Sequence, residues 1–189
     1  MITQVNICNS ALAKVGQAPI SSIDQETRAA QTLKSIFSLV QDELLACHPW
    51  NFALKRAQLV PNVTVPDFEF DFSYDIPSDC IRVLETETDT TQIGNSWVVE
   101  DGKILSNDST INIRYIYRNV NFSGWSPMFA EVMAWRLAQE IAYALTQSTE
   151  REKTCSENLR LSLSQARSID GAEGVLKGVI TDEWTESRQ

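Results

Sequence analysis

The stretch HPWNFA (residues 48–53) marks the point at which the pattern of the chain changes from helical to extended. Pro49 ends the preceding helix, because proline disfavours the helical conformation of the residue before it and supplies no N–H group. His48 is placed to donate to the last carbonyl groups of that helix or to complement its negative dipole end. Trp50 and Phe52 can fold back onto the helix end. The residues interpreted as structural are His48, Pro49, Trp50 and Phe52.

Two helices are predicted before this stretch. Apolar residues recur at steps of three and four over about residues 3–15, and Gly16 is placed just after the C-cap of this helix. A second helix is predicted over about residues 24–48, where apolar residues keep the helical period throughout. Either Ser22 or Asp24 can cap its N-terminus.

Two more helices are predicted in the C-terminal half. Ser126 followed by a proline is a good helix start, and an apolar stripe continues over about residues 127–147. Thr149 and Glu152 have the spacing of a capping box, so we expect a fourth helix over about residues 150–168. Its apolar stripe is narrower, and the short connection favours an antiparallel pair.

Between these helices, about residues 51–118 have the pattern of a β region. The stretch DFEFDFSYD (residues 67–75) alternates aromatic and polar residues, which predicts a half-buried strand. The Asp101-Gly102 pair predicts the turn of a hairpin. The residues expected to share a face are Phe68, Phe70, Phe72 and Tyr74 in the first of these strands and Ile111, Ile113, Tyr115 and Tyr117 in the last.

Together these elements predict an α+β fold. We expect a four-helix antiparallel bundle with an inserted small antiparallel β region, because neither helix pair alone can enclose a core. Residues 1–169 then form a single domain, and residues 170–189 form an extended C-terminal arm. The arm interleaves glycines with apolar residues, so it is either a frayed terminus or, as we prefer, a segment that orders on another chain. The arm residues predicted to bind a partner are Val175, Leu176, Val179, Ile180 and Trp184.

The composition sets limits on function. The chain has 189 residues and 43% hydrophobic residues, which is enough for a core. Its 16 Lys and Arg against 25 Asp and Glu give a net charge of −9, which argues against a DNA-binding regulator. No segment approaches the ~20 apolar residues of a membrane span, and we expect no export signal. The four cysteines lie far apart, which favours reduced, buried thiols over a zinc site and fits assembly in a cytoplasm.

No metal site is predicted, although the acidic residues of 67–75 invite comparison with a calcium loop. Phe72 stands at the position where an EF-hand requires glycine for its turn. Ser78 stands where that loop requires a glutamate. His48 is the only histidine, and a lone histidine without partners makes a poor ligand set.

No catalytic site is predicted either, and a carboxylate-dependent hydrolase associated with a phage tail is the alternative function. Glu85 with Glu87, or Asp71 with Asp75, could act as acid and base on a glycosidic bond. Nothing in the sequence favours one pair, and acidic residues at alternate strand positions usually form a solvated face. The known hydrolase, zinc-protease and nucleotide-binding motifs are absent from the sequence.

Four stretches of the chain, in this order, resemble one protein family. The family is that of tail tubular protein A, the head-to-tail adaptor or connector proteins of short-tailed bacteriophages. The resemblance covers most of residues 6–148, and the link between the first two helices and HPWNFA are its most telling parts. The stretches are NICNSALAKVGQAPISSID (6–24), DELLACHPWNFALKRAQL (42–59), YDIPSDCIRVLE (74–85) and SPMFAEVMAWRLAQEIAYALTQS (126–148).

The resemblance implies a ring, typically of twelve copies, that sits under the portal protein and carries the tail nozzle, a protein like tail tubular protein B. It implies an arm that reaches the portal and a channel through which DNA passes without sequence-specific binding. It implies no enzyme activity, cofactor or membrane contact, and a place in the virion after assembly in the host cytoplasm. The acidic surplus suits such a channel, since like charges do not form the ion pairs that hold a duplex in place.

Overall fold

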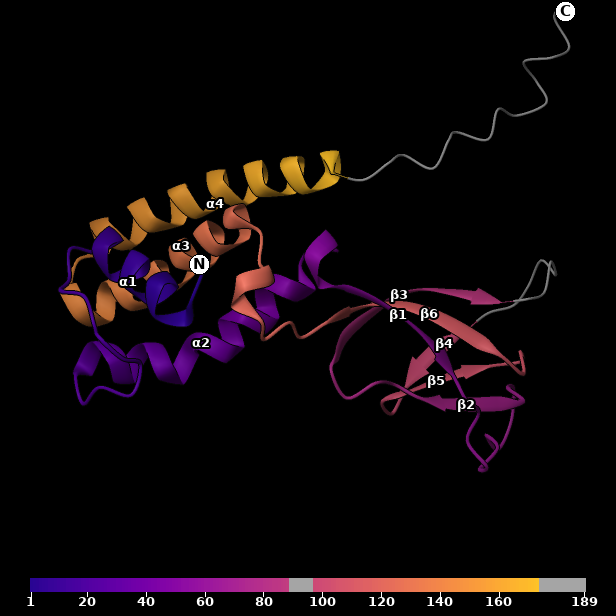
Figure 1. Cartoon of the computed structure of the whole chain (residues 1–189). Coiled ribbons are helices and arrows are strands. Elements are labelled where there is room, and N and C mark those ends of the chain that lie inside the picture. The colour runs from indigo at the N-terminus through magenta and orange to yellow at the C-terminus, as the bar shows by residue number, and fades with distance from the viewer. Residues whose placement is uncertain (89–96, 174–189) are drawn as a thin grey trace, which may run out of the picture.

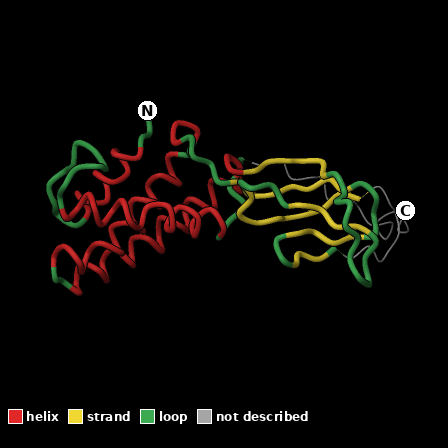
Figure 2. Tube along the Cα trace, turned by 90° about the horizontal axis from the view of Figure 1, so that it is seen from below, coloured by secondary structure: helices red, strands yellow, loops and turns green. Residues whose placement is uncertain are grey.

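The computed structural model describes residues 1–88 and 97–173 and shows an elongated molecule (Figure 1). The helices lie together at one end and the strands at the other, and Figure 2 shows the same division from below. The elements, in order, are α1 (Gln4–Lys14), α2 (Arg28–Ala46), the short 3-10 helix η1 (Asn51–Ala53), β1 (Leu54–Leu59), β2 (Phe72–Asp75), β3 (Cys80–Thr88), β4 (Val98–Glu100), β5 (Lys103–Ser106), β6 (Ile111–Tyr117), the 3-10 helix η2 (Phe122–Gly124), α3 (Pro127–Thr146) and α4 (Thr149–Ala172).

The α+β class is confirmed, but the prediction of a four-helix bundle is wrong. α3 lies in the middle of the helical part and contacts each of α1, α2 and α4. The bundle prediction assumes that each helix buries one apolar stripe, and α3 buries more than one. Its buried residues stand next to one another in the sequence as well as at steps of three and four, so it packs on several faces. These residues are Phe129, Val132, Met133, Ala134, Leu137, Ala138, Ile141 and Ala142.

The ends of the first two helices follow local hydrogen bonding. Gly16 has a φ of 70° just after α1, as the sequence predicts, and the Gln17 N–H donates to the carbonyl of Leu12 at 2.9 Å. α2 begins at Arg28, after the predicted start at 24. Thr27 caps it, because its hydroxyl accepts from a backbone N–H of the first turn at 3.3 Å.

The last helix is longer than predicted at its C-terminal end. Ser148, rather than Thr149, caps α4 and accepts from a backbone N–H of the first turn at 3.3 Å. α4 continues to Ala172, beyond the predicted end at 168, so the first residues of the predicted arm are helical. The reason is tertiary, because Asp170 is buried and its side chain contacts His48 and Asn51 in the segment that follows α2.

The β part consists of two three-stranded antiparallel sheets. Sheet A has the order β1-β6-β3, and sheet B has the order β2-β5-β4. The predicted hairpin joins β4 to β5, and Asp101 and Gly102 at its turn have φ values of 47° and 70°. Side chains from both sheets form one apolar cluster between them, whose buried members are Tyr74, Ile104, Ile111, Ile113 and Tyr115.

The predicted strand over residues 67–75 is wrong in its first half. Strand β2 begins only at Phe72, while Phe70 is buried and Phe68 is 79% exposed. Glu69 has a φ of 69°, which reverses the chain and ends the alternation of faces. Asp71 then enters sheet B by donating its backbone N–H to Asn107 Oδ1 at 2.9 Å.

The helical and β parts are joined by buried polar groups. The carbonyl of Asn119 accepts hydrogen bonds from Gln41 Nε2 at 3.1 Å and from Trp125 Nε1 at 3.0 Å. The Asn119 side chain donates in turn to the carbonyl of Phe52 at 3.2 Å. Because these donors come from both sides of the joint, they fix the β part relative to the helices.

Candidate functional site

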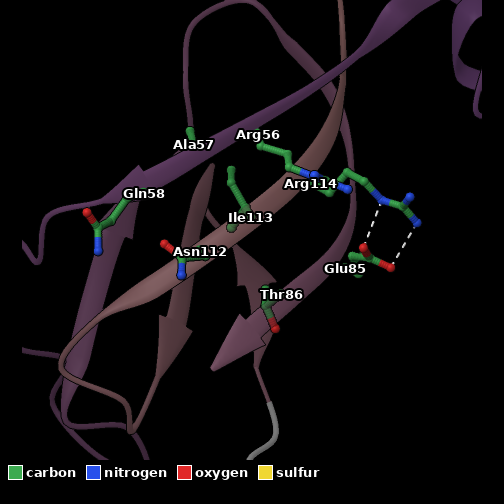
Figure 3. Close-up of a pocket in the computed structure, with 8 residues that line it drawn as sticks. All are labelled: Arg56, Ala57, Gln58, Glu85, Thr86, Asn112, Ile113 and Arg114. Atoms are coloured by element: carbon green, nitrogen blue, oxygen red, sulfur yellow. Dashed lines mark hydrogen bonds and ion pairs between the residues drawn. The ribbon is translucent and has the colours of Figure 1, made fainter. Parts of the chain in front are cut away.

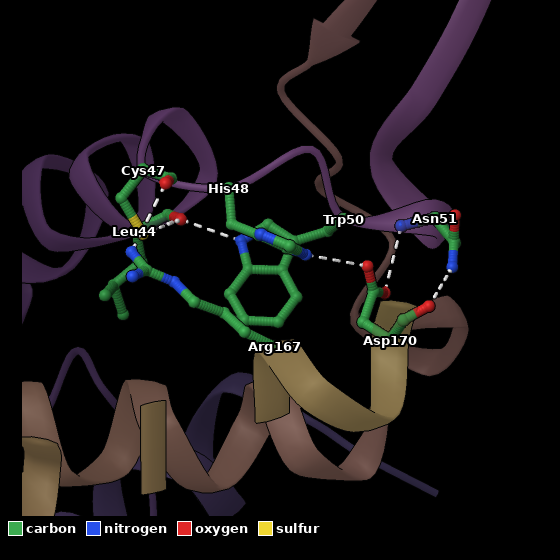
Figure 4. A network of polar contacts seen from close by, with 7 residues as sticks. All are labelled: Leu44, Cys47, His48, Trp50, Asn51, Arg167 and Asp170. Carbon is green, nitrogen blue, oxygen red and sulfur yellow. Dashed lines mark hydrogen bonds and ion pairs between the residues drawn. The ribbon is translucent and has the colours of Figure 1, made fainter. Parts of the chain in front are cut away.

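HPWNFA forms the centre of the joint, and Figure 4 shows its polar contacts. Trp50 folds back onto the end of α2, is 1% exposed and donates its indole N–H to the carbonyl of Leu44 at 2.8 Å. Its ring lies edge-on to Phe129 of α3, with 5.0 Å between the ring centroids. The Phe52 ring lies 4.9 Å from the same Phe129 ring, so this stretch joins α2, α3 and the sheet.

The His48 side chain does not donate to the last carbonyl groups of α2, which is the first of the two roles that the sequence suggests for it. Its Nε2 lies 3.0 Å from Asp170 Oδ2 at the end of α4. The other carboxylate oxygen of Asp170 accepts from the backbone N–H of Asn51 at 3.0 Å. The Cys47 carbonyl accepts a hydrogen bond from the Arg167 side chain at 3.3 Å. This network ties the last turn of α4 to the joint.

Asp170 is the residue of this network that the sequence analysis misses, because residue 170 falls in the predicted arm. Its side chain is only 7% exposed. The signal that could have found it is the spacing of the buried face of α4, on which Cys155, Ala166 and Asp170 follow one another at helical steps. A carboxylate on that face requires donors from elsewhere in the fold.

The outer face of sheet A carries a concave surface, and Figure 3 shows the residues that line it. A hollow of about 680 Å³ lies over it. Arg56 of β1 stands directly opposite Arg114 of β6, and Glu85 of β3 stands on the other side of Arg114. We name this surface the arginine face and define it by the residues Arg56, Gln58, Glu85, Asn112 and Arg114.

The residues that define the arginine face include two cations and one carboxylate. Glu85 holds Arg114 through two oxygens, at 2.8 Å to Nε and 2.9 Å to a terminal nitrogen. The side chain of Arg56 forms no hydrogen bond or ion pair with any of the side chains that the structure describes. Two like charges directly opposite each other in a sheet are destabilising. Glu85 offsets the charge of Arg114, whereas no described side chain offsets the charge of Arg56.

A second exposed surface is the loop between β1 and β2, residues 60–71, which we name the tip loop. Val63 is 100% exposed, Val65 60% and Phe68 79%. The loop is nevertheless held in place along the edge of sheet B. The Asn62 N–H donates to the Ser73 carbonyl at 2.8 Å, and the Ser73 hydroxyl donates to the Thr64 carbonyl at 3.0 Å.

The structure describes the side chains of three of the four carboxylates considered for the alternative hydrolase: Glu85, Asp71 and Asp75. Glu85 is bound by Arg114, and the side chain of Glu87 lies outside the described part of the chain. Asp75 accepts a hydrogen bond from Asn62 at 3.0 Å. Of the three carboxylates whose side chains are described, Glu85 lines the hollow over sheet A, and Asp71 and Asp75 do not.

The described ranges show the state of the four cysteines and whether side chains that could bind a metal ion lie together. Cys8 and Cys155 are buried as predicted, but Cys47 is exposed and Cys80 half-buried, and all four thiols are free. Within residues 1–88 and 97–173, no group of three or more His, Cys, Asp or Glu side chains could hold a metal ion. Burial raises the pKa of the Cys8 thiol to about 12.

The helices within the described ranges are all too short or too polar to cross a lipid bilayer. The arm residues predicted to bind the portal, Val175, Leu176, Val179, Ile180 and Trp184, lie outside the described residues. No protein-family model matches the chain, and no curated protein sequence matches it either.

Proposed function

We propose that the chain is a structural head-to-tail adaptor of a short-tailed bacteriophage. In this proposal its copies form a ring, of about twelve by the family resemblance, between the portal protein and the tail nozzle, and DNA passes through the ring. The chain performs no catalysis and needs no cofactor. Its place is the portal vertex of the virion, which it joins in the host cytoplasm.

The observation that carries the proposal is that the four resembling stretches pack together. The first includes α1 and the fourth is α3, and these two helices are in contact. The second holds Trp50 and Phe52, whose rings lie 5.0 Å and 4.9 Å from Phe129 in the fourth. The third reaches the second where Asp79 accepts from Lys55 Nζ at 2.6 Å. The resemblance therefore concerns one connected unit rather than scattered surface motifs.

Charge supports the same function. A chain with a net charge of −9 repels the phosphates of DNA on average, and a ring multiplies that charge by its number of copies. A channel through which genomic DNA must move benefits from weak, unspecific repulsion rather than from ion pairs that hold the duplex.

The proposal assigns the portal contact to the arm, and the variant that tests it must leave α4 complete. Asp170 belongs to the joint, since its carboxylate accepts from Asn51 and His48. The segment to remove in a test is therefore 174–189, which leaves this network intact. The matched point variant is Trp184→Ala.

The test combines a truncated chain with its portal protein. We expect the chain ending at Glu173 to keep the circular dichroism spectrum and melting temperature of the full chain and to lose binding to the portal in a pull-down. Electron microscopy of the full chain with the portal should show a ring. Unchanged portal binding by the truncated chain would contradict the role of the arm, and absence of both ring and portal binding would contradict the adaptor function.

A further inference from the structure

The tip loop exposes more apolar surface than a solvent-facing loop requires. Val60, Val63, Val65 and Phe68 are all exposed, and Phe68 is the largest of them. Single exposed apolar residues are common, but several on one short loop mark a contact site. The sequence pattern places Phe68 on the buried face of a strand. In the structure the strand begins only at Phe72, and Phe68 lies outside it and is exposed.

The loop is ordered although it is exposed. Phe70 is buried beneath it, and the Phe70 N–H donates to the Phe68 carbonyl at 2.9 Å across Glu69. Glu69 adopts a φ of 69°, a conformation that costs energy in a residue with a side chain and persists only where surrounding contacts impose it. Holding Phe68 outward in advance reduces the entropy lost on binding.

The charges on the loop define the chemistry of its partner. Asp67, Glu69 and Asp71 are exposed and flank or follow Phe68. A surface that accepts this loop must therefore offer an apolar floor for a phenyl ring and at least one cation beside it.

The arginine face has that chemistry. Its hollow of about 680 Å³ is lined by Arg56, Gln58, Asn112 and Arg114, and the methylene groups of the two arginine side chains supply apolar atoms beside their guanidinium groups. Arg56 supplies a guanidinium that no described residue neutralises. A carboxylate that approached Arg56 would complete the charge balance that Glu85 provides for Arg114.

The two surfaces lie on different sides of the β part. The tip loop follows the free edge of β2 in sheet B, through the hydrogen bond of Asn62 to Ser73. The arginine face points away from sheet B, because the opposite face of sheet A forms the cluster that packs on sheet B. In Figure 1 the loop hangs below β2, while β3 and β6 lie above it. A head-to-tail contact between copies uses one surface from each.

We propose that the tip loop of one copy docks on the arginine face of a second copy of this chain, with Phe68 over the hollow and the carboxylate of Asp67 or Glu69 beside Arg56. Repeated from copy to copy, this heterologous contact builds a closed ring, and in that respect it rests on the adaptor function proposed above. Because ion pairs contribute to it, the association weakens as the salt concentration rises.

The experiment uses two charge-reversed chains and one apolar variant. The face variant is Arg56→Glu, which keeps the Arg114–Glu85 pair. The tip variant is Asp67→Lys with Glu69→Lys. The apolar variant is Phe68→Ala, and Leu39→Ala, an exposed residue of α2, is its matched control. Association is measured by sedimentation velocity of the full chain alone and by electron microscopy with the portal, after circular dichroism has shown that each variant is folded.

We expect Phe68→Ala to weaken self-association at least about tenfold and Leu39→Ala to leave it unchanged. The face variant and the tip variant should each fail to associate alone. Mixed in equal amounts they should assemble again, because each basic tip then meets an acidic face and each acidic tip a basic one. Recovery in the mixture is a result that a folding defect cannot produce.

Assemblies that persist in all three variants would overturn the docking contact and leave the adaptor function standing. Loss of portal binding by Phe68→Ala with unchanged self-association would also overturn it, because the loop would then bind the portal. Self-association that follows the charge pattern without any portal binding would support the contact and contradict the adaptor. A wild-type chain that associates neither with itself nor with the portal would contradict both.

Discussion

Replacing Asp170 by alanine tests the joint between the helical and β parts most directly. The carboxylate accepts from the Asn51 backbone N–H at 3.0 Å and from His48 Nε2 at 3.0 Å, and it is 7% exposed. In Asp170→Ala both donors lose this acceptor, and each buried donor without a partner costs about 1–3 kcal/mol. The Asn51 side chain still donates to the backbone carbonyl of residue 170, at 2.6 Å in the native chain, which limits the damage. We expect the free energy of unfolding to fall by about 3 kcal/mol.

The assay is thermal unfolding followed by circular dichroism, with urea unfolding as a second measurement. In a chain of this length, about 3 kcal/mol corresponds to a melting temperature lower by about 6–12 °C. Asp24→Ala is the control, because Asp24 forms an exposed ion pair with Lys34 at 2.8 Å. Its loss should cost less than about 1 kcal/mol. If Asp170→Ala shifted the melting temperature no more than Asp24→Ala, the carboxylate would not support the joint and the argument would fail.

A double-mutant cycle separates the two donors. His48→Ala alone removes one partner of Asp170, and the double variant removes both side chains. Because the two groups are in contact, we expect the double variant to be more stable than the sum of the single effects predicts, by about 1–2 kcal/mol. Strictly additive effects would show that the Asn51 N–H alone accounts for the contribution of Asp170.

Three further predictions test other parts of the fold. Trp50→Ala should cost about 3–5 kcal/mol in urea unfolding, because its ring is 1% exposed; a shift too small to measure would contradict that burial. The hydrogen bond from Lys55 lowers the pKa of Asp79, so its contribution to stability is present above the unfolded value of about 3.9 and is lost as the pH falls through the folded pKa. Asp79→Asn should therefore be less stable than wild type at neutral pH, and in pH-dependent melting the difference should shrink as the pH falls through the folded pKa of Asp79. Cys47 should react with iodoacetamide in the native chain well before Cys8, as mass spectrometry of timed samples can show, because Cys8 is buried and its pKa is raised to about 12.

The parts of the fold that the sequence predicts are those set by neighbouring residues. The Asp101-Gly102 pair fixes a hairpin because both residues tolerate positive φ, and Gly16 ends α1 for the same reason. Pro49 stops α2 through sterics that need no tertiary partner. The order of helices and strands follows from such signals together with the spacing of apolar residues.

The arrangement of the helices depends on contacts that spacing does not reveal. α3 has buried residues on several faces because three helices surround it, while a stripe read from spacing assigns it one face only. The start of α2 likewise depends on which of several neighbouring hydroxyl and carboxyl side chains caps the helix. Thr27 is the cap in the structure, although Ser22 and Asp24 have side chains equally suited to that role.

Phe68 and Asp170 are the two residues that the sequence places wrongly in a way that matters for function. The pattern puts the Phe68 ring on the same face as Phe70 and Tyr74 and assigns Asp170 to the arm, whereas in the structure Phe68 is exposed and Asp170 is buried at the end of α4. The burial of Asp170 is explained within one chain, since Asn51 and His48, more than a hundred residues away, supply its donors. The exposure of Phe68 has no such explanation within residues 1–88 and 97–173, because its ring contacts no other aromatic ring there and its loop is held with the ring outward. A buried polar group that finds its partners belongs to the architecture of the chain, whereas a fixed, exposed apolar group calls for a partner outside it. The Arg56 guanidinium likewise has no partner among the described side chains, and the proposed contact with a second copy would give a partner to both Phe68 and Arg56.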